Sequence, residues 1–150
     1  MIVVLDSSVV LRVLLRGGPV LRVWGRWQAA YASELVGVEV RRVIERLRLT
    51  SVLDDAGVIA AIGGLDEIER GVGLIPLSRA VLRRAGQPMG TVVGTLDAIH
   101  LASALLFQER KDPSVVFATH DTQQALAAGR AGTYVRPALK ASSCERAQSL

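Results

Sequence analysis

The sequence has one cysteine, two histidines and few aromatic residues, and each shortage excludes a class of protein. Cys144 cannot form a disulfide within the chain, and together with His100 and His120 it offers too few ligands for a structural zinc site. Aromatic residues make up 4% of the chain, which argues against binding single-stranded bases by stacking. The cysteine usage fits a reducing compartment.

Long apolar runs are also missing. No stretch approaches the ~20 apolar residues that span a bilayer. The N-terminal stretch MIVVLDSSVV lacks a basic segment and is interrupted by Asp6, so it does not resemble a secretory signal. We therefore expect a soluble, cytoplasmic protein that does not act at a membrane.

The composition that remains is that of one ordinary globular domain. The chain has 150 residues, of which 50% are hydrophobic and 21% charged. Its formal net charge is +4, which favours anionic partners, chiefly nucleic acid. All basic residues except Lys111 and Lys140 are arginine, which suits phosphate contacts, but a GC-rich genome would produce the same excess.

Apolar runs alternate with segments of helical periodicity, which predicts an α/β fold. The predicted strands are residues 2–5 (IVVL), VGLIPLS, SVVFATHD and TYVRP. The predicted helices are VVLRVLLR, a segment from Val20 to Trp27, SELVGVEVRRVIERLRL, SVLDDAGVIAAIGGLDEIERG with an interruption at Gly63–Gly64, SRAVLRRAG, GTLDAIHLASALLF and TQQALAAGRAG. We expect a three-layer α/β/α sandwich around a mainly parallel sheet of four or five strands. It should form a single domain over residues 1–136, with 137–150 as a flexible tail.

Two acids follow predicted strands, where parallel α/β folds place their functional groups. Asp6 comes after IVVL and Asp121 comes after VVFATH. Each acid alone is equally well explained as the N-cap of the next helix. Because neighbouring strands lie ~4.8 Å apart, two carboxylates at strand ends can also come close together.

A third acid, Asp97, lies near the start of the apolar stretch GTLDAIHLASALLF. If Thr95 caps this helix, the helix dipole stabilises Asp97 by ~0.3–1 kcal/mol. The surrounding residues indicate a packed helix, and burial of an unpaired charge costs more than the dipole returns. A cation facing Asp97 would be a large enough compensation.

The fourth acid comes from the helix that contains Glu34, Glu39 and Glu45. Glu34 follows a predicted cap, and Glu45 lies among arginines that can pair with it. Glu39 lies between Val38 and Val40 in the most apolar part of the helix, so it is the candidate. Four converging carboxylates would need a raised pKa or a metal, and oxygen ligands suit Mg²⁺ or Mn²⁺.

The two histidines are weaker candidates for the site. His100 shares a helix face with Asp97 and could act as a general acid, but a hydrogen-bonded histidine of the core or of the site's surroundings is the better interpretation. His120 precedes Asp121 in a strand, so its side chain should point to the opposite side. The chain has no dinucleotide-binding glycine motif, Walker A motif or serine nucleophile elbow.

Four segments together resemble the PIN-domain family, specifically the VapC-type toxins of bacterial toxin–antitoxin pairs. They are VVLDSSVVLRVLL, SELVGVEVRRVIERL, LDAIHLASALLF and VFATHDTQQALAAGRAGTYV, and they span residues 2 to about 136. The resemblance implies an α/β/α sandwich whose acidic quartet binds Mg²⁺ or Mn²⁺. The positions that match the quartet are Asp6, Glu39, Asp97 and Asp121; those that match its surroundings are Ser8, Thr119 and Arg42.

The resemblance further implies a metal-dependent endoribonuclease that acts on structured RNA such as tRNA or ribosomal RNA. It also implies a homodimer that is inhibited by a cognate antitoxin. Thr122 stands where many relatives have a basic residue, which bears on how RNA phosphate is held. On this hypothesis, Asp6→Asn abolishes cleavage with little loss of stability.

Two other functions remain open from the residues. The same fold can serve as a non-catalytic module that binds RNA or a partner protein, with its acids acting as caps and ion pairs. A different Mg²⁺-dependent phosphoryl enzyme, such as a phosphatase, is a smaller possibility, although the DSS after the first strand lacks the Asp-x-Asp pattern of the best-known kind.

Overall fold

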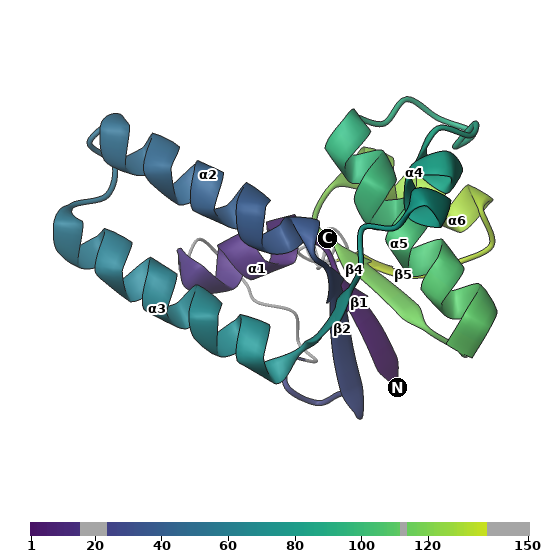
Figure 1. Ribbon diagram of the computed structural model, residues 1–150, viewed down its shortest axis with the longest axis horizontal. Coiled ribbons are helices and arrows are strands. Elements are labelled where there is room, and N and C mark those ends of the chain that lie inside the picture. The colour runs from purple at the N-terminus through teal and green to yellow at the C-terminus, as the bar shows by residue number, and fades with distance from the viewer. Residues whose placement is uncertain (16–23, 112–113, 138–150) are drawn as a thin grey trace, which may run out of the picture.

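The fold is built on a five-stranded sheet in which every neighbouring pair of strands is parallel. The structure is a computed structural model that describes residues 1–15, 24–111 and 114–137. The strands are β1 (Ile2–Leu5), β2 (Ala29–Ser33), β3 (Gly73–Ile75), β4 (Val116–Thr119) and β5 (Tyr134–Pro137). Their order is β3-β2-β1-β4-β5, so β1 lies in the centre between β2 and β4 (Figure 1).

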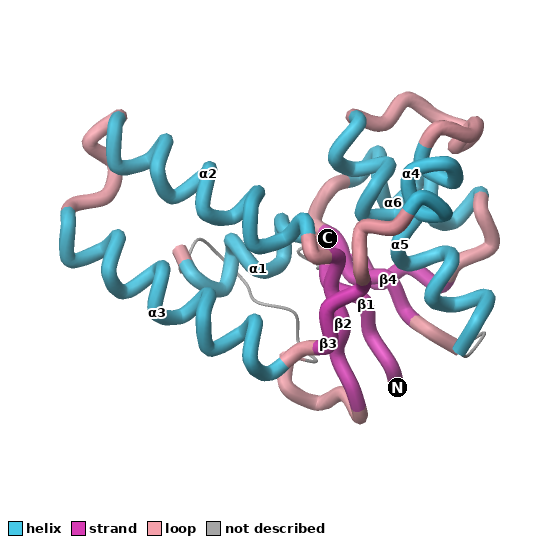
Figure 2. Tube along the Cα trace, viewed as in Figure 1, coloured by secondary structure: helices cyan, strands magenta, loops and turns pink. Residues whose placement is uncertain are grey.

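Helices cover both faces of this sheet, as Figures 1 and 2 show. On one side lie α1 (Ser7–Leu14), α2 (Leu35–Leu49) and α3 (Asp55–Gly71); on the other lie α4 (Arg79–Ala85), α5 (Thr95–Lys111) and α6 (Thr122–Arg130). This arrangement confirms the predicted three-layer α/β/α sandwich and its parallel sheet. Among the described residues, no helix is long and apolar enough to cross a membrane.

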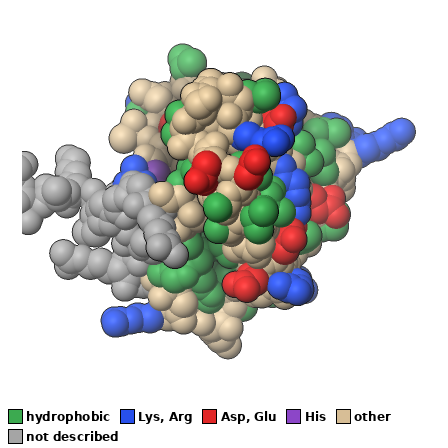
Figure 3. Space-filling model, turned by 90° about the vertical axis from the view of Figure 1, so that its left-hand side faces the viewer, with side chains coloured by type: hydrophobic (Ala, Val, Ile, Leu, Met, Phe, Trp, Pro, Cys, Tyr) green, Lys and Arg blue, Asp and Glu red, His purple; other side chains and the backbone are tan. Residues whose placement is uncertain are grey.

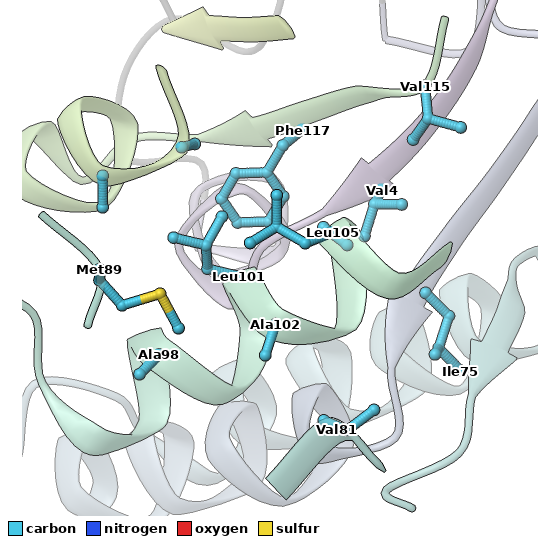
Figure 4. Packing of buried hydrophobic residues seen from close by; sticks show 13 residues of the cluster. Val4, Ile75, Val81, Met89, Ala98, Leu101, Ala102, Leu105, Val115 and Phe117 are labelled. Atoms are coloured by element: carbon cyan, nitrogen blue, oxygen red, sulfur yellow. The ribbon is translucent and has the colours of Figure 1, made fainter. Parts of the chain in front are cut away.

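The central strands are apolar because both of their faces are buried. Val3 and Leu5 pack into the core under α1, α2 and α3, whereas Val4 between them packs into the opposite core. In that second core the ring of Phe117 from β4 lies against α5, beside Leu101 and Leu105 (Figure 4). Alternate residues of β1 therefore contribute to the two cores on opposite faces of the sheet.

Two regions before α2 differ from the sequence prediction. Strand β2 was missed because AAYAS is rich in alanine, which has low strand propensity; pairing with β1 on one side and β3 on the other outweighs that propensity. Residues 24–28 form turns and bends rather than a helix, and Trp24 and Trp27 stack edge to face at 5.0 Å there. The rest of that predicted helix, and the tail from 138 onward, lie outside the described residues.

Helix α3 runs without a break through Gly63–Gly64, where an interruption was predicted. A Cβ on Gly64 would come 2.8 Å from Leu14 of α1, so this glycine allows α1 and α3 to approach closely. A Cβ on Gly63 would meet nothing within 4 Å. The glycine pair therefore belongs to helix packing and not to a helix end.

The α2–α3 side of the molecule carries mixed charge. Arg41 on α2 pairs with Asp66 at 2.9 Å and with Glu69 at 2.8 Å, both on α3. Glu45, expected to be ion-paired, forms no ion pair within the described ranges. Figure 3 looks at this end of the molecule and shows basic and acidic side chains intermixed with hydrophobic ones. The visible described surface here lacks the broad basic patch that a nucleic-acid interface would need.

One glycine in the sheet supports a test of the packing. Gly73 of β3 is paired with Tyr31 of β2, and a Cβ on Gly73 would collide with the Tyr31 ring, which itself packs against Phe107 at 4.3 Å. We expect Gly73→Ala to lower the free energy of unfolding by about 1–3 kcal/mol, because overpacking forces the ring to move. Urea unfolding measures the change.

The matched control is Gly63→Ala, whose added methyl group meets no neighbour. Because alanine favours a helix interior over glycine by up to about 1 kcal/mol, this variant should be as stable as the wild type or more stable. Equal stability of Gly73→Ala and wild type would contradict the proposed collision.

Candidate active site

Asp6 lies directly after the central strand β1, with 2% of its surface exposed. Its backbone N–H donates to Ala118 of β4 at 2.9 Å, which holds it beside the end of that strand. Its carboxylate caps α1 by accepting the Ser8 N–H at 3.1 Å. Oδ2 also lies 2.5 Å from Ser8 Oγ and 3.1 Å from Thr119 Oγ1. Ser8 therefore gives Oδ2 two donors, which hold the carboxylate in one orientation.

Thr119 is the last residue of β4, and Asp121 follows that strand at the same edge of the sheet. The buried Thr119 hydroxyl accepts the Asp121 N–H at 3.0 Å, and Ser8 Oγ accepts the His120 N–H at 3.0 Å. The bond from His120 joins the segment after β4 to the first turn of α1. The exposed Asp121 carboxylate caps α6 by accepting the Gln124 N–H at 2.7 Å. Both strand-end acids are thus helix N-caps, and they also lie at one edge of the sheet.

Asp97 is in the first turn of α5. Gly94, rather than the predicted Thr95, is the capping residue, because its carbonyl accepts the first helical bond from Ala98 at 2.9 Å. The Asp97 carboxylate accepts a hydrogen bond from the Gly94 backbone in return. A Cβ on Gly94 would lie 2.9 Å from Asp97 Oδ2, so a glycine leaves the carboxylate room to fold back over the helix start.

The electrostatics of Asp97 link the four acids. Burial raises the pKa of Asp97 above its ordinary value. Repulsion raises this pKa further, and its sources are Asp6, Asp121 and Glu39 in decreasing order. The Gly94 hydrogen bond offsets only part of these effects. Four carboxylates from four separate segments are therefore close enough to repel one another, and among the described residues no cationic side chain lowers the pKa of Asp97.

Glu39 projects from α2 and has a partner of its own. Its Oε2 lies 2.7 Å from Nε2 of His100 on α5, whose surface is only 1% exposed. Burial acts to raise the pKa of Glu39, but hydrogen bonds from His100 and Ser7, together with the His100 charge, outweigh it and lower this pKa. His100 Nδ1 is buried without a hydrogen-bond partner among the described residues. The histidine thus orients Glu39 through one nitrogen only.

Arg42 lies apart from the acidic site, whereas His120 lies within the electrostatic field of Asp6. Arg42, expected near the acids, is exposed on α2 and makes no hydrogen bond or ion pair within the described part of the chain. The sequence interpretation excluded His120 from the site, but Asp6 acts on the pKa of this histidine. Burial lowers its pKa and the charge of Arg12 lowers it further, while Asp6 acts in the opposite direction. His120 follows the last residue of β4, outside the strand, and lies within the electrostatic field of Asp6.

Gln124 is the site residue that sequence reasoning missed. It is fully buried in α6, and its side-chain Nε2 donates to Asp6 Oδ1 at 3.1 Å and to the Asp97 carbonyl at 3.3 Å. Its Oε1 accepts from Thr119 Oγ1 at 2.5 Å. The available signal was its place three residues after Asp121, on the α6 face that also buries Ala127 and Ala128.

The chemistry of the four carboxylates suits a hard divalent cation, whereas their present arrangement is not yet that of a metal site. Carboxylate oxygens without cysteine ligands are what Mg²⁺ and Mn²⁺ prefer, and the repulsion on Asp97 is what a cation would remove. Within the described ranges, however, no group of three or more acidic, histidine or cysteine residues is gathered closely enough to hold a metal as it stands. The carboxylates would have to draw inward around an ion.

The domain has three layers and a parallel sheet with an acidic site at its carboxyl edge. The site consists of a buried, hydrogen-bonded aspartate at the end of the central strand and three further acids around it. The chain belongs to the PIN domain family, whose sequence profile matches residues 3–129. No curated protein sequence matches the chain significantly.

Solved structures with the same fold include proteins from three bacteria. VapBC2 from Rickettsia felis, bound to a promoter DNA fragment, has 12% identity and a TM-score of 0.62, and the match covers 91% of this chain and 98% of that one. VapBC-5 from Mycobacterium tuberculosis, a member of the VapBC family of toxin–antitoxin systems, has 15% identity and a TM-score of 0.63, with coverages of 91% and 98%. FitAcB from Neisseria gonorrhoeae has 21% identity and a TM-score of 0.57, with coverages of 89% and 95%. At these identities the likeness establishes the fold.

Proposed function

We propose that this chain is a metal-dependent endoribonuclease of the VapC type, which hydrolyses phosphodiester bonds of structured RNA such as tRNA or ribosomal RNA. The observation that carries the proposal is the raised pKa of Asp97, caused by burial and by three neighbouring carboxylates, in a chain of the PIN domain family. PIN domains are generally nucleases, and uncompensated repulsion among acids is the electrostatic condition that favours a bound cation.

Each residue of the site has a role in this proposal. Asp6, Glu39, Asp97 and Asp121 would hold Mg²⁺ or Mn²⁺, which supplies an activated water and stabilises the leaving oxygen. Ser8 fixes the orientation of Asp6 through its Oδ2, and Thr119 supports Asp6 through Gln124, to which its hydroxyl donates. His100 fixes Glu39 in the same way from α5. The net charge of +4 favours an anionic polymer as the substrate.

The partners follow from the structural neighbours. VapBC-5 is named as a member of the VapBC family of toxin–antitoxin systems, and VapBC2 as bound to a DNA fragment from its promoter. We propose that this chain is likewise neutralised by a cognate antitoxin protein and that it forms a homodimer in the cytoplasm. These assignments rest on the shared fold and on the family.

The test is cleavage of a mixed tRNA and ribosomal RNA pool by the purified protein, free of any antitoxin. We expect discrete products with Mg²⁺ or Mn²⁺ and none with EDTA, because in this proposal the bound ion supplies the activated water. Cleavage that persists unchanged in EDTA would contradict metal dependence. Absence of cleavage by folded protein in the presence of metal would contradict nuclease activity on these RNAs.

A second function, a non-catalytic module that binds RNA or a partner protein, is favoured by one observation. No three potential ligands among the described residues form a ready metal site. A Mn²⁺ titration separates the two functions. A ligand at one hundred times its Kd stabilises the native state by about 2.7 kcal/mol, so a nuclease should melt at increasing temperature as Mn²⁺ is added. A binding module should show no such shift.

A further inference from the structure

Gln124 makes hydrogen bonds to three of the four acidic residues. Its Nε2 donates to the Asp6 side chain at 3.1 Å and to the Asp97 backbone carbonyl at 3.3 Å. Its backbone N–H donates to the Asp121 side chain at 2.7 Å. No part of Gln124 is exposed, so these bonds are made away from competing water. One side chain on α6 thereby joins the end of β1 to the first turn of α5.

The chemistry of the neighbours fixes which way the amide points. Asp6 Oδ1 and the Asp97 carbonyl only accept hydrogen bonds, so the NH₂ group must face them. The amide oxygen then faces the Thr119 hydroxyl, which lies 2.5 Å away and can donate to it. A carboxylate at position 124 would repel Asp6, and an apolar side chain there would leave Asp6 Oδ1 without its hydrogen-bond donor. The network therefore requires an amide of this length.

Asp6 is consequently held from both sides. Ser8 and Thr119 surround Oδ2, whereas Gln124 is the contact of Oδ1. Without the Gln124 amide, the carboxylate loses the bond that opposes rotation about its last side-chain torsion. The first turn of α5, which carries Asp97, loses its tether to β1 at the same time. Side chains that orient metal-binding groups in this way typically contribute 10–100-fold to metal affinity.

We propose that Gln124 is a positioning residue for the metal site: it sets the orientation of Asp6 and the distance between Asp6 and Asp97, and so determines how tightly Mg²⁺ or Mn²⁺ binds. The inference rests on the proposed function. It adds to that function a residue that is neither an acid nor a hydroxyl and that stands outside the four-carboxylate set. Gln124 itself does not touch the ion or the RNA.

The experiment is a calorimetric Mn²⁺ titration of the full chain as wild type, Gln124→Met and Gln123→Met. Methionine is close to glutamine in length and removes both donor and acceptor. We expect Gln124→Met to bind Mn²⁺ about tenfold more weakly or worse. Gln123→Met is the matched control: Gln123 is exposed on the same helix, accepts from Thr91 at 3.2 Å, and should leave the affinity unchanged.

Far-ultraviolet circular dichroism and urea unfolding of each variant separate positioning from general stability. If Gln124 only holds the fold together, Gln124→Met lowers the unfolding free energy while the folded protein still binds Mn²⁺ with wild-type affinity; that result overturns the inference. Should Gln124→Met fail to fold, Gln124→Asn keeps the amide but is one methylene too short to span Thr119 and Asp6. It should bind Mn²⁺ several-fold more weakly than the wild type, and wild-type affinity would overturn the inference.

Cleavage assays at saturating Mn²⁺ give an independent readout. We expect Gln124→Met to lower kcat with little change in the KM for RNA, because the residue acts on the acids and not on the substrate. If wild-type protein binds no Mn²⁺, the proposed function fails, and this inference fails with it. If the wild type binds Mn²⁺ and Gln124→Met binds it equally well, only the inference fails.

Discussion

Asp97→Asn should abolish RNA cleavage and yet raise the melting temperature of the metal-free protein. Burial and three neighbouring carboxylates raise the pKa of Asp97, so its ionised form is unfavourable in the folded state without a cation. Asparagine removes the charge but keeps an oxygen that can accept the Gly94 hydrogen bond. Removing a metal ligand loses several kcal/mol of transition-state stabilisation, which corresponds to a loss of activity of about a hundredfold or more.

The measurement combines the RNA cleavage assay with melting curves in EDTA and in Mn²⁺. The wild type should gain stability with Mn²⁺, and Asp97→Asn should gain little or none. Asp55→Asn is the matched control, because Asp55 also lies in the first turn of a helix but is exposed and pairs with Arg48 at 3.2 Å. The control should cleave normally and lose at most about 1 kcal/mol. A metal-free Asp97→Asn that melts below the wild type would contradict the repulsion at this site.

The same pair of proteins has a defined pH dependence. A carboxyl whose pKa is higher in the folded than in the unfolded state binds protons more readily when folded, so stability falls as pH rises. For Asp97 the fall begins near the unfolded pKa of about 3.8 and ends above the raised folded value. Asp97→Asn lacks this contribution. Its stability advantage in EDTA should therefore grow through that window and become constant at higher pH.

The positions of the acids after strands followed from the sequence because parallel strands end at a common edge. An acid after the buried run IVVL and another after VVFATH had to lie near each other once both strands joined one sheet. Asp97 was identified from the cost of placing a charge in an apolar helix. In the structure Asp97 is only partly buried, beside exposed Thr95 and Leu96, yet burial is still the largest cause of its raised pKa.

Other features depend on contacts that no local pattern records. Strand β2 exists because β1 and β3 flank it, and nothing in AAYAS favours a strand strongly. Gln124 resembles any polar residue of an amphipathic helix until α6 is packed against the ends of β1 and β4. The same holds for the pairing of His100 with Glu39, which are 61 positions apart in the chain. Long-range polar networks follow from the packed fold rather than from spacing.

Asp6 illustrates how these contacts change the choice of variant. From the sequence, Asp6→Asn was expected to cost little stability. In the structure the Asp6 carboxylate faces three donors, the Ser8 backbone and the side chains of Ser8 and Gln124, while the single Thr119 hydroxyl proton faces Gln124 Oε1. An amide NH₂ group in place of either oxygen would face one of these donors, and an unsatisfied buried donor costs about 1–3 kcal/mol. Asp97→Asn is therefore the cleaner test of the site.

His100→Leu should lower the free energy of unfolding by about 1–2 kcal/mol at neutral pH. The bond between His100 Nε2 and Glu39 Oε2 is 2.7 Å long and involves a charged group, and such bonds contribute about 1.5–3 kcal/mol. Leucine also removes Nδ1, which is buried without a partner in the described structure, so part of the loss is offset. Urea unfolding at several pH values measures the difference, and Glu39→Gln, which keeps an acceptor for His100, should lose less.

The pH dependence of this loss distinguishes the hydrogen bond from simple packing. His100 and Ser7 lower the pKa of Glu39 in the folded protein, so their stabilisation of the ionised carboxylate is fully present above the unfolded pKa of about 4.5. It disappears as pH falls through the lower, folded value. The difference between wild type and His100→Leu should therefore shrink in acid. A difference that is the same at pH 3 and pH 7 would mean that His100 stabilises the core by its volume alone, and that Glu39 is oriented by other groups.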